Sequence, residues 1–245
     1  MTIYLEAFSI TLLISSVFSL AGVGGGAAII PILNMLGVPF GLSKAAGLFV
    51  NISATTISTI MNLKRKALDI KFAIPLAISL MIFLPIGAYL SQFMNEKIMK
   101  LMLVGFLFFT ASMILFGKKE AKINYQKKWV LYLIGSSVGL FSGIVGVSGG
   151  NLILAMLILL GYEAKKMVLV ISFIIPFSSF AGFITYANII HIDWILISVI
   201  GVAAFIGGFI GNKIMFFNLD SKQIKKIIAI LLYFIAIKLG YSLIK

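Results

Sequence analysis

Cysteine is absent from this 245-residue chain, histidine occurs once, and only seven residues are acidic. Without cysteine, disulfides, iron–sulfur clusters and thiolate metal sites are excluded. Charged residues make up 11% of the chain, whereas soluble domains average about 25%. By contrast, 61% of the residues are hydrophobic and the mean hydropathy is +1.16. These values predict an all-α polytopic membrane protein without a separate soluble domain.

The acidic side chains all fall at the ends of apolar segments or in loops: Glu6, Asp69, Glu96, Glu120, Glu163, Asp193 and Asp220. No predicted span therefore has a central carboxylate, which argues against a buried proton relay or a carboxylate Na⁺ site. The single histidine, His191, is interpreted as a surface residue. Metalloprotease, Walker and nucleophile–base motifs are missing, so we expect no enzyme activity, no cofactor and no metal site.

The excess of basic residues gives a net charge of +13, which could indicate a nucleic-acid partner. The lysines and arginines, however, lie in short loops between apolar segments. That placement is typical of positive-inside topology signals, so we expect no nucleic-acid partner and a lipid bilayer instead. The first apolar segment lacks a basic n-region and a clear cleavage site, and is interpreted as part of the mature protein.

Two apolar segments are too short to cross a bilayer. Most segments approach the ~20 residues that a span needs, but 27–37 and 151–161 have about eleven each, too few to cross as helices. Both follow glycine-rich stretches, 22–26 and 146–150. Consecutive glycines disfavour helix, and broken helices occur in membranes only where the freed backbone meets protein, water or ligand. We therefore predict two half-helices.

The two halves of the chain form an internal repeat with a constant offset of 124 residues. The offset superposes, among others, Gly22 on Gly146, Gly25 on Gly149, Gly26 on Gly150, Asp69 on Asp193 and Gly87 on Gly211. The predicted organisation is a first membrane repeat (1–117), a basic cytoplasmic linker (118–128) and a second membrane repeat (129–245), which together form one integral domain.

Loop charges orient the two repeats. The Lys64–Lys66 loop is basic, whereas its counterpart, 188–192, has no lysine or arginine. The last loop is rich in lysine and its first-half counterpart is less so. Because cytoplasmic loops carry the positive charge, equivalent loops lie on opposite sides. We predict two inverted repeats, each a glycine-tipped broken-helix hairpin plus three transmembrane helices.

Inverted repeats with helices broken at corresponding places are typical of a transport site near the membrane midplane. Each half-helix would offer unpaired backbone N–H groups and the positive end of its dipole to an anion. The predicted backbone site consists of Gly24, Gly25, Gly26, Ser148, Gly149, Gly150 and Asn151. The alternative is that these glycines only allow helices to cross closely.

Polar side chains on the segments that follow each half-helix could complete the site. Asn51 and Ser172 are predicted to donate hydrogen bonds to a ligand near the midplane. For serine and threonine, bonding back to their own helix is the alternative. Asn151 could serve instead as a helix cap.

The residues that carry this pattern resemble the TauE/SafE family of sulfite and organosulfonate exporters. The first half is similar at Ala21–Gly26, Pro31 and Leu36–Pro39, and the second at Ser142–Gly150, Leu160–Gly161 and Asp193–Trp194. The resemblance implies a multi-pass permease of a prokaryotic cell membrane that exports sulfite or a sulfonate. Two departures concern the substrate: Gly47–Phe49 and Val170–Ser172 replace a Gly-Thr-Ser element, and Ala155 replaces a proline.

The predicted function is therefore export of a small anion, most simply sulfite or a related sulfur oxyanion or organosulfonate, by alternating access around the midplane site. One alternative is a transporter or channel for another small solute or ion. The other is a non-transporting membrane scaffold subunit. The sequence leaves the oligomeric state open.

Overall fold

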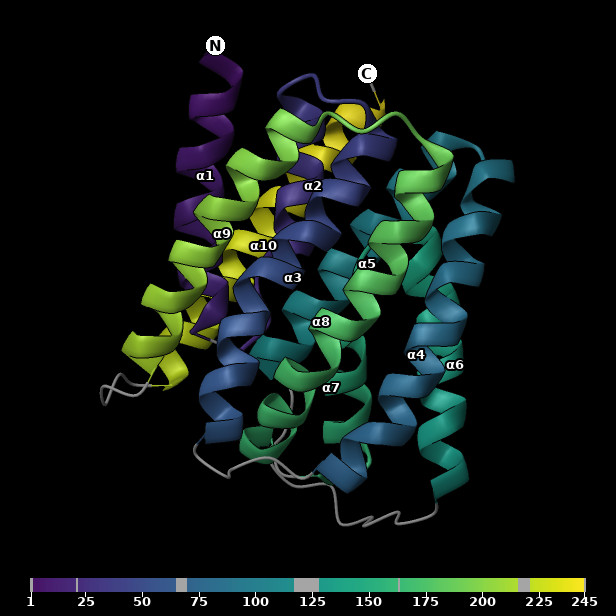
Figure 1. Cartoon of the computed structure of the whole chain (residues 1–245), viewed down its shortest axis with the longest axis vertical. Helices are drawn as coiled ribbons and strands as arrows, with labels where there is room; N and C mark the ends of the chain where they lie inside the picture. The colour runs from purple at the N-terminus through teal and green to yellow at the C-terminus, as the bar shows by residue number, and fades with distance from the viewer. Residues whose placement is uncertain are drawn as a thin grey trace.

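The computed structural model describes residues 2–20, 22–64, 70–116, 128–162, 164–215 and 221–244, and within them the chain is helical with no strand. This confirms the all-α prediction. The helices, coloured along the chain in Figure 1, are α1 Thr2–Ser19, α2 Gly26–Met35, α3 Phe40–Lys64, α4 Ile70–Leu90, η1 Ser91–Phe93, α5 Glu96–Phe116, α6 Lys128–Val145, α7 Gly150–Leu159, α8 Ala164–Ile189, α9 Trp194–Met215 and α10 Ser221–Ile244.

Six of the described helices are long and apolar enough to span a membrane, three in each half: those at α3, α4, α5, α8, α9 and α10. Each half begins instead with a helical hairpin, α1 with α2 and α6 with α7. The short helices α2 and α7 have 10 residues each, or about 15 Å of axis, which is half a bilayer core. The chain is a multi-pass membrane protein.

Glycine defines both ends of the half-helices. The residue before each helix has a left-handed backbone: Gly25 at φ 90° and Gly149 at φ 72°. Each helix ends at another left-handed glycine, Gly37 or Gly161. There the next N–H turns back to a carbonyl of the last turn, Val38 to Leu33 and Tyr162 to Leu157, both at 3.0 Å. This is the Schellman type of ending, so the glycines fix the length of each half-helix.

The first helix of each half packs against the other half. In Figure 1, α1 lies beside α9 and α4 beside α6. Glycine permits the closest approach at both places. A Cβ added at Gly211 would lie 2.2 Å from Ser16 O, and one at Gly87 would lie 2.1 Å from Leu140 O. The offset of 124 residues superposes these two contacts on each other. Close helix packing therefore explains why glycine occurs at equivalent positions of the two halves.

Two pairs of equivalent helices, α3 with α8 and α5 with α10, meet and run antiparallel. On α3 and α8, Asn62 bonds Ser172 at one end, and the Phe49 and Phe183 rings lie 5.1 Å apart nearer the other. On α5 and α10, the Ser112 hydroxyl bonds the Tyr233 hydroxyl at 2.7 Å. Antiparallel equivalents are what an inverted repeat requires. The inverted topology in a membrane, like the division at 117 and 129, stays a prediction.

Some predicted features lie outside the described residues. They are nearly all of the linker 118–128, most of the Lys64–Lys66 loop, and the acidic residues Asp69, Glu120, Glu163 and Asp220.

Leucine at Gly87 or Gly211 is expected to destabilise the fold, because the new side chain would meet backbone that cannot move aside. Overpacking of this kind costs about 1–3 kcal/mol or more. Melting temperatures of the purified variants in detergent measure the effect. Gly105→Leu on α5 is the control, since nothing lies within 4 Å of a Cβ there. Equal melting temperatures for all three variants would contradict this packing.

Candidate functional site

Asn51 of α3 caps the first half-helix. The Gly26 N–H donates to Asn51 Oδ1 at 2.8 Å, in a fully buried contact. The side chain of Asn51 is itself 2% exposed. Because an N–H can bond only to the oxygen of the amide, the Asn51 –NH₂ group is left as a donor. No hydrogen bond among the described residues uses that nitrogen, so Asn51 offers an unpaired donor beside the helix start.

The N-terminus of α2 packs directly against α3. A Cβ at Gly26 would lie 2.0 Å from Gly47 O and 2.6 Å from Asn51 Nδ2. A Cβ at Gly24, where φ is 79°, would lie 2.8 Å from Asn51 Oδ1 and 2.9 Å from the Thr55 methyl carbon. Both glycines therefore bring bare backbone against the amide of Asn51, as a ligand-binding turn and a close helix crossing each require.

The second half-helix starts in a more apolar setting. Adding 124 to Asn51 gives Ile175, and a Cβ at Gly150 would lie 2.6 Å from Ile175 Cδ1. The polar contact here comes from one turn further along α8, where Ser178 Oγ donates to Ser148 O at 3.3 Å. Ser148 is 5% exposed. The two turns therefore share a backbone shape but differ in side-chain chemistry.

Both turns hold backbone donors without partners. Among the described residues, no hydrogen bond uses the N–H of Gly24 or Gly25 in the first turn, or of Ser148, Gly149, Gly150 or Asn151 in the second. Unpaired N–H groups at a helix start, together with the positive end of the helix dipole, suit an anion. The Gly26 N–H differs from its predicted role, because Asn51 already accepts it.

Ser172 lies near the far end of α3, away from the amide of Asn51, and no hydrogen bond among the described residues joins Asn151 to Asn51. The Ser172 hydroxyl donates to Leu169 O at 2.7 Å and accepts from Asn62 Nδ2 at 2.9 Å, so it joins α8 to the far end of α3. Asn151 is the second residue of α7 and is half-buried. No hydrogen bond among the described residues links one glycine turn to the other. The role of all these residues in binding stays a prediction.

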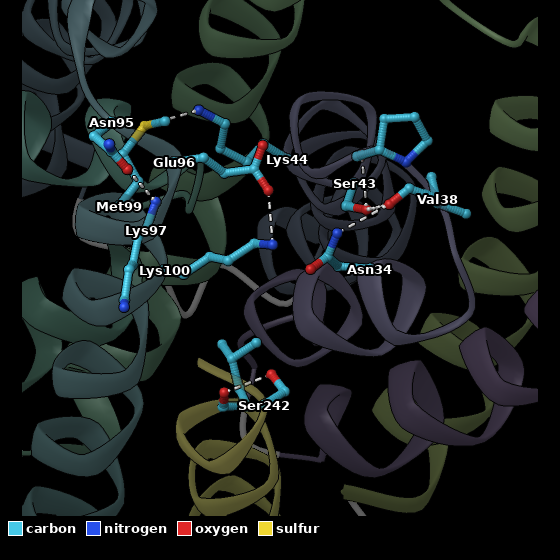
Figure 2. Close-up of polar contacts among 12 residues, drawn as sticks. Asn34, Val38, Ser43, Lys44, Asn95, Glu96, Lys97, Met99, Lys100 and Ser242 are labelled. Atoms are coloured by element: carbon cyan, nitrogen blue, oxygen red, sulfur yellow. Dashed lines mark hydrogen bonds and ion pairs between the residues drawn. The ribbon is translucent and has the colours of Figure 1, made fainter. Parts of the chain in front are cut away.

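A buried lysine was missed by the sequence reasoning. Lys44 lies in the first turns of α3 and is 3% exposed. Its Nζ donates to Ser91 Oγ at 3.2 Å and contacts Met99 Sδ at 3.4 Å, as Figure 2 shows for Met99. It also lies 4.7 Å from the centre of the Tyr186 ring. One feature of the sequence could have predicted its burial: Lys44 lies seven residues before Asn51 and therefore on the same face of the helix.

Lys44 also contacts the second glycine turn. A Cβ at Gly146 would lie 2.5 Å from both Cβ and Cγ of Lys44. The equivalent glycine, Gly22, meets Val168 instead, 124 residues after Lys44. A buried lysine therefore contacts the second glycine turn but has no equivalent at the first.

Comparison with known proteins decides the family. The family model described as sulfite exporter TauE/SafE matches residues 7–239. The chain belongs to the TauE/SafE family. The resemblance seen in the glycine motifs is thereby confirmed, and this family is named for transport, not for an enzyme activity.

Two relatives of this TauE/SafE chain are described as probable membrane transporter proteins. One, from Methanocaldococcus jannaschii, is 30% identical over 177 residues, which cover 69% of this chain and 66% of the relative. The other, YunE of Bacillus subtilis, is 26% identical over 264 residues, covering 94% of this chain and 95% of the relative. No solved structure matches the chain significantly. The TauE/SafE chain is thus a membrane transporter that handles a small substrate from within a lipid bilayer.

Proposed function

We propose that this transporter exports a small anion, sulfite or a related sulfur oxyanion or organosulfonate, across the cell membrane of a prokaryote. Alternating access would take place around the two glycine turns. The substrate class follows from the family name and from the donors available. The unpaired N–H groups and the Asn51 amide are all donors, and a cation would need carbonyls or carboxylates instead.

The observation that carries the proposal is the Asn51 amide. Its oxygen is held by Gly26 at 2.8 Å, which turns the –NH₂ group into a fixed donor at the positive end of α2. A donor without a partner is costly on a side chain that is only 2% exposed. An anion bound at the turn would satisfy that donor and the free N–H groups of Gly24 and Gly25 together. A purely structural glycine crossing does not require the amide.

The energy for export would come from the membrane potential. Among the described residues, no aspartate or glutamate is buried, so a carboxylate that carries a coupling proton is missing from the buried part of the spans. An inside-negative potential favours the exit of an anion by about 2.3 kcal/mol per charge per 100 mV.

Purified protein in liposomes tests both claims. Sulfite is expected to move toward the positive side when a potassium gradient and valinomycin impose a potential, at a rate that rises with voltage. Sulfate, thiosulfate and sulfonates offered as competitors would rank the substrates. Protein-free liposomes give the background. Transport that follows a pH gradient but ignores voltage would contradict the energy source, and transport of a cation alone would contradict the anion proposal.

A further inference from the structure

Polar residues form a buried line along one face of α3. Lys44, Asn51, Thr55, Ser58 and Asn62 follow one another at steps of seven, four, three and four residues, so they share one face of the helix. Each is at most 3% exposed. Polar side chains are costly inside a membrane protein, so a continuous buried line of them marks a path or a binding site rather than ordinary packing.

The antiparallel helix α8 presents a matching line. Ser172, Ser179 and Tyr186 are spaced by seven residues and are all buried. Asn62 bonds Ser172 at one end, while Lys44 lies 4.7 Å from the Tyr186 ring centre at the other. We call these eight residues the α3–α8 seam. It passes Asn51, and therefore the first glycine turn, between its two ends.

Hydrogen bonds within the protein do not satisfy every polar atom of the seam. Ser58 Oγ, Asn62 Oδ1 and Ser179 Oγ are buried and have no hydrogen-bond partner. Buried polar atoms in folded proteins are nearly always satisfied by protein or by water. Three of the eight such atoms among the described residues lie in this seam, where water or a polar substrate could satisfy them.

Lys44 is the only charged side chain buried in the described part of the chain. Among the described residues no ion pair within 4.0 Å joins its Nζ to a carboxylate; Glu96, whose charge acts on Lys44 from nearby, pairs directly with Lys100 at 2.7 Å. Figure 2 shows this pair on α5, next to Met99. The described oxygen partner of the ammonium is a neutral hydroxyl, that of Ser91. A buried charge without a counter-ion in direct contact is unfavourable, and an anion beside it would offset that cost.

We propose that the α3–α8 seam is the substrate path and that Lys44, at its Tyr186 end, is the residue that recognises the charge of the anion. This rests on the proposed function. The ammonium would pair with the anion as it passes between that end of the bundle and the Asn51 donor, about 10 Å along the helix. Tyr186 holds this end in place, because its hydroxyl donates to Gly143 O at 2.6 Å.

The experiment compares a charged and a neutral competitor of one shape. Methanesulfonate and methanesulfonamide are tested as inhibitors of sulfite uptake into liposomes that contain the full chain. Wild type is expected to prefer the anion by at least tenfold. In Lys44→Met that preference is expected to fall close to one, and the KM for sulfite to rise about 10- to 100-fold, as expected when a charged hydrogen bond is lost.

Control variants separate recognition from folding. Lys100→Met removes a lysine from the adjacent α5 and should leave both values unchanged, while Lys44→Arg should keep most of the preference. Lys44→Gln is a second neutral variant. An unchanged preference in a folded neutral variant would overturn the proposal, as would failure of both neutral variants to fold while Lys44→Arg folds. If wild type moves no anion, the proposed function itself fails, which is a distinct result.

Discussion

Asn51→Asp is expected to abolish anion transport while leaving the fold intact. Aspartate has nearly the same shape as asparagine, and its carboxylate can still accept the Gly26 N–H that Oδ1 accepts at 2.8 Å. Aspartate is also a favourable helix cap beside the positive end of α2. The –NH₂ donor is lost, however, and a negative charge takes its place.

The expected loss in uptake rate is on the order of 100- to 1,000-fold. It combines a lost hydrogen bond to a charged group with repulsion between like charges. The measurement is sulfite uptake into liposomes, together with the melting temperature in detergent. Asn95→Asp is the matched control, because Asn95 accepts the Lys97 N–H at 2.8 Å before α5 but is exposed. Normal transport by folded Asn51→Asp would remove Asn51 from the site.

Gly26→Ala is expected to displace the first half-helix from α3, whereas Gly150→Ala is expected to be tolerated. The two glycines occupy equivalent places and neither has a positive φ, so alanine fits the backbone at both. Their surroundings differ. The new Cβ at Gly26 would lie 2.0 Å from Gly47 O, which is backbone of α3, whereas at Gly150 the nearest atom is the flexible end of Ile175.

Backbone cannot move aside without separating α2 from α3, while an isoleucine can change rotamer. We expect Gly26→Ala to lose about 1–3 kcal/mol or more of stability and most transport, and Gly150→Ala to change little. Melting temperature and sulfite uptake measure both variants side by side. If the two variants have the same stability and uptake, the difference between the two glycine turns does not matter for function.

The sequence predicted the architecture well because its signals are local. The half-helices at 27–37 and 151–161 appear as α2 and α7, since glycine at both ends sets their length. Six spanning helices follow from hydrophobic length. The offset of 124 residues also placed Gly87 and Gly211 in equivalent positions, although their contacts with Leu140 and Ser16 became visible only in the structure.

The site was harder to predict because it depends on contacts between helices. Asn51 was predicted as a donor near the glycines, and its amide does lie there, but with its oxygen bound to Gly26. Ser172 was predicted as a second donor to the same ligand, yet the offset pairs Ser172 with Leu48, and its hydroxyl bonds Asn62. Lys44 was missed because its burial comes from contacts with Ser91, Met99 and Tyr186, which lie on three other segments.

The exchange of first helices between halves has a consequence for how the protein is made. α1 packs against α9, nearly 200 residues later in the chain, so the ribosome completes α1 long before its partner exists. Until Gly207 and Gly211 are made, Ser15, Ser16 and Ser19 of α1 lack the helix that they contact in the fold. Long-range contacts of this kind slow assembly. The packing of α1 therefore depends on the second half of the chain.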